Sequence, residues 1–163
     1  MENEKEPMTR SSIESKIDLF SIEILEQDDN SDNWGTMGQI RVGKDFCERF
    51  SINFSFWSPK DYRLSWTNAL RNIDKSSTST SCLIASITDP ENSNFVSCWP
   101  MYRYGDVVYV QNSLIFLDQL SEPFNPEHPW NHIQPHQEVS DDGTRISQWT
   151  TSISAVREFR RDY

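Results

Sequence analysis

The chain has 163 residues, 36% of them hydrophobic and 12% aromatic, with 25 acidic and 15 basic side chains and a formal net charge of -10. This length fits one domain of roughly 100 to 200 residues, and 6 Trp, 9 Phe and 5 Tyr supply apolar area that a disordered acidic chain would lack. The acidity argues against general nucleic-acid affinity, which depends on Lys and Arg neutralising phosphates, and it indicates a basic partner.

Neither a membrane span nor a secretory signal is predicted. No run approaches the ~18 apolar residues that a spanning helix needs, and the first ten residues, MENEKEPMTR, are charged and acidic. The three cysteines, Cys47, Cys82 and Cys98, show no CxxC spacing, which indicates neither a disulfide scaffold nor a zinc ribbon. We therefore expect a cytoplasmic protein.

The negative charge is concentrated at the start of the chain. Residues 1–33 carry 10 acidic and 3 basic side chains, whereas residues 34–163 carry 15 and 12. Residues 1–12 are expected to be a disordered acidic leader, and residues 13–163 a single domain. Within that domain, residues 26–33 (EQDDNSDN) predict an acidic loop of turn-forming residues.

Strands are predicted first in the domain. Apolar residues indicate one strand through Ile17, Leu19, Ile22 and Ile24, and a second at Gly38–Val42. Apolar and polar residues then alternate over seven positions at 50–56, the clearest strand pattern in the sequence. That alternation places Phe50, Ile52, Phe54 and Phe56 on one face of a sheet.

A helix is predicted directly after this strand. Ser58 before Pro59 combines an N-cap residue with proline at the first helical position. The following apolar residues have helical spacing and form one inward stripe. They are Tyr62, Trp66, Ala69, Leu70 and Ile73.

The second half of the chain predicts a meander of strands. Residues 82–88, 95–103 and 107–111 are joined by short turns, which implies an antiparallel sheet. Residues 113–120 could form a strand or a helical turn, because short apolar runs cannot be assigned by periodicity alone. Four prolines between positions 123 and 135 predict a loop.

A last strand and a last helix complete the predicted fold. The strand is expected at 144–150, and Ser152 caps a helix with Ile153, Val156 and Phe159 turned inward. Together these elements predict an α+β single domain. Its antiparallel sheet would have about five to seven strands, with two helices packed on it.

The motifs predict no catalytic residue and no cofactor. With five glycines, the chain has neither a GxGxxG pattern nor a phosphate-binding GxxxxGKS or GxxxxGKT pattern. Cys82 and Cys98 lie on predicted strands among apolar neighbours, where a free cysteine is usually a small core residue. Asp141 and Asp142 are adjacent in a predicted turn, where carboxylates point into solvent instead of converging for acid–base chemistry.

Three histidines are the best candidates for a metal site. His128, His132 and His136 recur at a spacing of four, which on a helix would bring their side chains to one face. Pro129 and Pro135 interrupt such a helix, and the HPWNH stretch lacks the glutamate of an HExxH motif. We therefore expect histidines that are solvated or packed in a loop, and no metal ion.

Residues 50–159 carry a series of spaced motifs. They are Phe56-Trp57, Asp61-Tyr62 with Trp66, Asp89-Pro90-Glu91, Asn94-Phe95, Trp99 with Tyr102, Val108-Tyr109-Val110-Gln111-Asn112, Ile115-Phe116-Leu117, and Gly143 with Ile146-Ser147 and Trp149. In this order they resemble the CdiI immunity proteins of bacterial contact-dependent growth inhibition systems, and VYVQN followed by IFL is the most specific part. The resemblance covers about two thirds of the chain, without the first 33 residues and the proline-rich stretch.

The resemblance implies a non-catalytic, cytoplasmic inhibitor. Such a protein binds the C-terminal toxin domain of a CdiA effector and protects the cell that produces it. Many of these toxins are nucleases, and the basic cleft of a nuclease would complement an acidic inhibitor. The implied fold is a single domain with an antiparallel sheet and packed helices, similar in outline to Whirly domains.

A Whirly-like module that binds single-stranded nucleic acid is the alternative function. Tyr102, Tyr104 and Tyr109 flank one predicted hairpin, and exposed aromatic side chains on a sheet can stack bases. Such a site also needs a basic groove, yet the hairpin offers Arg103 alone against Asp106. A Whirly-like fold does not by itself imply nucleic-acid binding, because similar folds can carry different functions. The function of an immunity protein is therefore favoured.

The candidates for toxin binding combine acidic loops, which steer a basic partner, with loop tryptophans, which can anchor it. They are Asp28, Asp29, Asp32, Trp34, Trp130, Glu138, Asp141 and Asp142. Direct contact with nucleic acid or with a membrane is not expected.

Overall fold

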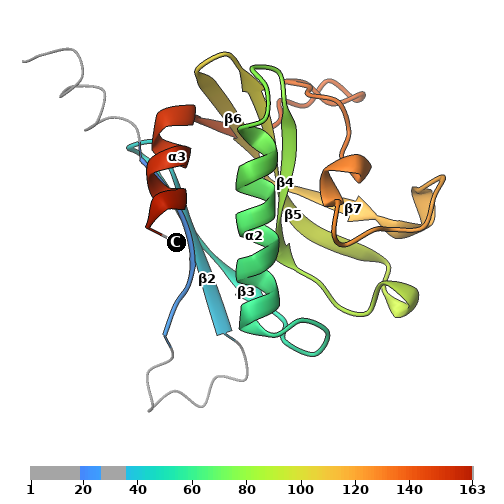
Figure 1. Cartoon of the computed structure of the whole chain (residues 1–163). Helices are drawn as coiled ribbons and strands as arrows, with labels where there is room; N and C mark the ends of the chain where they lie inside the picture. Colours follow the sequence, from blue (N-terminus) through green and yellow to red (C-terminus); the bar gives the residue numbers. More distant parts are fainter. Residues whose placement is uncertain (1–18, 27–35, 163) are drawn as a thin grey trace, which may run out of the picture.

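The computed structural model describes residues 19–26 and 36–162, and there the strands form two antiparallel sheets with two helices against them (Figure 1). Sheet A has the order β1 (Phe20–Ile24), β2 (Thr36–Val42) and β3 (Phe46–Ile52). Sheet B contains β4 (Thr80–Ser86), β5 (Phe95–Tyr104), β6 (Val107–Gln111) and β8 (Gln148–Ser152), with β7 (Ser113–Phe116) paired to β5. The helices are α2 (Pro59–Ile73) and α3 (Ile153–Arg161). The predicted α+β class with two helices is confirmed, and its strands are divided between two sheets.

Helix α2 begins where the sequence predicted, because Ser58 and Asp61 cap it reciprocally. The Ser58 hydroxyl accepts from the Asp61 N–H at 3.3 Å, and the Asp61 carboxylate accepts from the Ser58 N–H at 2.9 Å. All five residues of the predicted apolar stripe are buried. From this stripe Trp66 Nε1 donates to the Ile84 carbonyl of β4 at 2.8 Å, which holds α2 on sheet B.

The strand predicted at 50–56 is wrong in its position. β3 is Phe46–Ile52, so the alternating pattern runs four residues beyond the end of the strand. The chain turns at Asn53, whose side-chain oxygen accepts from the N–H of Ser55 at 2.8 Å. Phe54 then packs against Tyr62, with ring centroids 5.8 Å apart, and Phe56 is exposed. Two of the four predicted sheet residues therefore belong to the loop before α2.

Two other strands begin later in the chain than predicted. β1 begins at Phe20, so Leu19, which was predicted to belong to the strand, precedes it and is exposed, whereas Phe20 and Ile22 are buried. The last strand begins at Gln148, four residues later than predicted, because the preceding residues turn back through a single bridge between Val139 and Arg145. The ambiguous 113–120 stretch contains both alternatives, a strand followed by a 3-10 turn at Leu117–Gln119.

The two faces of sheet B are covered by different parts of the chain. One face carries Trp99, which packs edge-on against Phe46 and Phe50 of β3 and joins the two sheets. The opposite face carries Tyr102, whose hydroxyl donates to the Gln134 carbonyl at 2.7 Å. This second face lies under residues 121–137, called here the proline-rich segment, which is orange in Figure 1. β4 is buried on both faces as a result.

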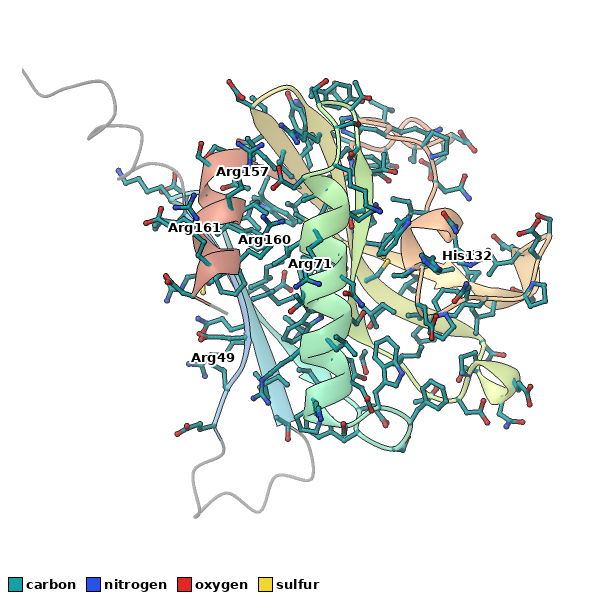
Figure 2. All side chains as sticks on the ribbon, in the orientation of Figure 1. Arg49, Arg71, His132, Arg157, Arg160 and Arg161 are labelled. Atoms are coloured by element: carbon teal, nitrogen blue, oxygen red, sulfur yellow. The ribbon has the colours of Figure 1, made fainter. Side chains whose placement is uncertain are left out.

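The two helices meet at a charged cluster. Asp74, at the end of α2, accepts from Arg157 Nε of α3 at 2.8 Å and pairs with Arg160 at 3.2 Å. Figure 2 shows these two arginines directed from α3 toward α2. None of the helices in the described residues is long and apolar enough to cross a membrane.

Candidate functional site

The structure places four of the eight predicted toxin-binding residues. Glu138, Asp141 and Asp142 are exposed after the proline-rich segment, whereas Trp130 is half-buried and packs against the core. The remaining four, Asp28, Asp29, Asp32 and Trp34, lie outside the described residues, as does the expected leader 1–12.

One hollow of about 780 Å³ lies where the β2–β3 turn faces β8. We call it the β8 hollow. The rings of Phe46 and Trp149 stack at its wall with centroids 3.6 Å apart. Its charged lining is mixed, with basic Lys44 and Arg145 near acidic residues that include Glu138. A surface with both charges has no clear preference for a basic or an acidic partner.

A second hollow of about 540 Å³ lies between β7 and the proline-rich segment. We call it the β7 hollow. Leu114 and Phe116 come from β7, His132 and Ile133 come from the proline-rich segment, and Asp141 lies in the turn beyond it. None of the residues that line it in the described part of the chain is Lys or Arg. Its lining therefore combines apolar groups with negative charge.

The tyrosines predicted to flank one hairpin hold the proline-rich segment on sheet B. His136 Nε2 donates to Gln148 Oε1 at 2.9 Å, so its Nδ1 accepts from the Tyr104 hydroxyl at 2.9 Å. The His136 ring also stacks on Tyr102 and lies near Tyr109, with centroids 4.7 Å and 5.2 Å away. The aromatic faces that could stack bases are thus engaged by the protein's own histidine.

The other two histidines stabilise the loop itself. The backbone N–H of Asn125 donates to His132 Nε2 at 3.0 Å, and burial lowers the pKa of His132. His128 lies edge-on to Trp130, with centroids 5.3 Å apart. Among the described residues, no three His, Cys, Asp or Glu side chains are grouped to hold a metal ion.

Cys82 and Cys98 are buried in the core, as the sequence predicted. Burial raises the pKa of the Cys82 thiol, which keeps it protonated and unreactive. The histidines and these cysteines therefore have structural roles in the fold.

Three exposed apolar residues near the β7 hollow were not among the predicted site residues. Phe95 and Phe116 are cross-strand partners on β5 and β7, and they are 48% and 45% exposed. Leu114, two positions before Phe116, is on the same strand face and 43% exposed. Three consecutive apolar residues in SLIF gave no alternation from which to choose the outward ones, and the structure shows that only Ile115 of this strand is buried.

The charges of the domain are distributed unevenly along the chain. Residues 86–143 carry nine acidic side chains and one basic, Arg103, whereas residues 36–85 and 144–162 carry six acidic and eleven basic ones. All nine carboxylates are exposed, but Arg103 is buried and donates to the Gly105 and Ile73 carbonyls. The nine are Asp89, Glu91, Asp106, Asp118, Glu122, Glu127, Glu138, Asp141 and Asp142.

Figure 2 shows where five of the basic side chains lie. The labelled arginines lie on the helices and on sheet A, while His132 lies on the proline-rich segment across the molecule. The nearly balanced charge of residues 34–163 therefore conceals one segment, residues 86–143, whose exposed charged side chains are all acidic.

Comparison with known proteins identifies the family of this chain. The family model described as the CdiI N-terminal domain matches residues 52–159. The immunity protein CdiI of Enterobacter cloacae subsp. cloacae is 35% identical over 118 residues, which cover 72% of this chain and 80% of that protein. A chain of the solved CdiA-CT/CdiI toxin and immunity complex from Enterobacter cloacae has a TM-score of 0.78 and 30% identity, covering 88% of this chain and 97% of that one. The chain therefore belongs to the CdiI family of immunity proteins.

Proposed function

We propose that this protein binds the C-terminal toxin domain of a CdiA effector and neutralises it in the cytoplasm of the cell that produces both. The observation that carries the proposal is the family match over most of the domain. The likeness of the whole fold to a chain of a toxin and immunity complex supports the same partner.

Inhibition by binding, without catalysis, agrees with the roles of the reactive side chains. His132 and His136 are engaged in hydrogen bonds of the loop, and Cys82 is buried. A stoichiometric inhibitor needs an extended complementary surface instead of a catalytic group.

A nuclease is the toxin class that the charge favours. Nucleases bind phosphates with Lys and Arg, so their clefts are basic. The nine exposed carboxylates of residues 86–143 would attract such a cleft and speed association. We therefore infer that the inhibitor is complementary to a basic nuclease surface.

Co-expression tests the proposal. Cells that express the cognate toxin domain should grow only when they also express this chain, and the two proteins should elute as one complex in size exclusion. In a titration with purified toxin, cleavage of RNA or DNA should stop at one equivalent of inhibitor. Growth arrest in the presence of the chain, without a complex, would refute the proposal.

The single-strand-binding alternative is less well supported, because Tyr102, Tyr104 and Tyr109 surround His136. Titration with labelled single-stranded DNA at low salt separates the two functions. We expect no binding tighter than about 10⁻⁴ M, the weak end of non-specific affinity.

A further inference from the structure

We propose that the β7 hollow and the exposed side chains Phe95, Leu114 and Phe116 form the surface on which the basic face of the toxin domain docks. The inference rests on the proposed function and adds to it a location on the molecule. It excludes the β8 hollow and the outward face of α2 as the main contact.

The apolar part of this surface has the features of an interface centre. Phe95 and Phe116 are adjacent across β5 and β7 on the Trp99 face of sheet B, and Leu114 and Phe116 of the edge strand β7 also line the hollow, so the surface continues around this edge. Each of the three is more than two-fifths exposed. Exposed apolar groups gathered beside a hollow, with a polar rim, are typical of protein-binding surfaces.

Acidic side chains surround this apolar centre. Asp118 lies between Phe116 and Gln119, which both line the hollow, and Glu122 is close enough to His132 to interact with it electrostatically. Asp141 lines the hollow itself. Asp89 and Glu91 lie in the loop that leads to Phe95 and continue the acidic rim.

These carboxylates remain available to a partner. Among the described residues, the salt bridges all involve Asp74 and none involves a carboxylate of this rim. The Ser140 hydroxyl donates to Asp142 and holds the pKa of that carboxyl below its ordinary value, so it stays charged. The rim therefore keeps its negative charge until a basic surface covers it.

The charge selects one kind of occupant. A second copy of this chain would bring the same acidic rim against itself, and nucleic acid or an anionic membrane would be repelled in the same way. A protein face rich in Lys and Arg, with an apolar residue to fill the hollow, is complementary to both features.

Paired substitutions test the apolar centre. The double variant Leu114→Ser with Phe116→Ser should raise the Kd for the purified cognate toxin domain at least ~10-fold, as loss of interface anchors does. Leu64→Ser is the matched control, because Leu64 is 58% exposed on α2 and lies outside the proposed surface. It should change the Kd less than about twofold. Circular dichroism melting verifies that each variant is folded.

Charge reversal tests the rim. Glu122→Lys with Asp141→Lys should slow association at least ~10-fold at low salt, with a smaller change in dissociation. Glu23→Lys with Glu158→Lys changes the net charge equally on exposed positions of β1 and α3, and it should have a much weaker effect. Equal slowing by both variants would overturn the proposed location.

Hydrogen exchange of the unmodified complex provides a test that needs no variant. Residues 112–122 and 132–141 should become protected on toxin binding, while the exchange of α2 stays unchanged. If the unmodified protein binds toxin but is protected elsewhere, the surface is wrong and the proposed function stands. If the unmodified protein binds no cognate toxin, the proposed function itself fails.

Discussion

Asp74 shows how one residue joins elements that are distant in sequence. Its carboxylate follows α2 and accepts from Arg157 and Arg160 of α3, and Arg103 of β5 lies 3.7 Å away. The hydrogen bond from Arg157, with the charges of all three arginines, lowers the pKa of Asp74 below its ordinary value of 3.8, although burial opposes the shift. The aspartate therefore stabilises the contact between the helices in its charged form.

Replacing Asp74 by Asn should lower the free energy of unfolding by about 1–3 kcal/mol at pH 7, between the values for exposed and buried ion pairs. Because folding lowers the pKa, this contribution is complete above pH ~4 and is lost as the pH falls through the folded-state pKa. Urea unfolding of both proteins from pH 3 to pH 7 measures it.

The difference in the free energy of unfolding between the wild type and the Asp74→Asn variant should be constant from pH 5 to pH 7 and become smaller toward pH 3. Glu158→Gln, which removes one exposed carboxylate from α3, is the control for loss of a negative charge without loss of these ion pairs. A difference that grows at low pH would contradict the assigned role of Asp74.

At the scale of elements, the proline-rich segment folds as a cover for one face of sheet B. Its prolines prevent a long helix and leave one 3-10 turn at Pro129–His132, so side chains hold the segment in place. Tyr102 donates to Gln134, and His136 bridges Tyr104 and Gln148. These contacts also position the wall of the β7 hollow, because His132, Ile133 and Gln134 line it.

Replacing His136 by Ala should destabilise the protein by about 1–3 kcal/mol, through the loss of two hydrogen bonds and a ring stack. Hydrogen exchange should accelerate in residues 133–146 well before it does in α2. Tyr104→Phe is the matched control, because it removes one of the two bonds and should cost about 1 kcal/mol. Equal acceleration in α2 would show that His136 supports the whole fold instead of this cover.

At the scale of the whole molecule, charge separation is the feature most closely connected with function. Residues 86–143 carry nine exposed carboxylates and no exposed Lys or Arg, while the helices and sheet A carry most of the exposed basic residues. An acidic surface segment of this kind would attract a basic partner before contact. The acidic residues 1–33 would add to the long-range attraction.

Reversing the charges of Asp28, Asp29 and Asp32 to Lys should slow association with the toxin more than it speeds dissociation. Stopped-flow association at two ionic strengths measures this, because the Debye length falls from ~30 Å at 0.01 M salt to ~8 Å at 0.15 M. The difference in association rate between the wild type and the variant should be smaller at the higher salt concentration. Identical association rates at low salt would exclude steering by this segment.

Local chemistry allowed part of this protein to be predicted from its sequence. The capping residues Ser58 and Ser152 determine where α2 and α3 begin, and the helical spacing of Tyr62 and Trp66 determines which face is buried. The series of motifs identified the family. These features depend on contacts within a few residues of one another, or on patterns that the sequence displays directly.

Other features were decided only by the tertiary structure. The pattern at 50–56 continues past the end of β3, because aromatic residues can alternate as well in a loop that packs on Tyr62 as in a strand. The sequence determined the net charge of each segment. Only the fold buried Arg103 and left the nine carboxylates of residues 86–143 exposed, because charge on a surface depends on which residues folding leaves exposed.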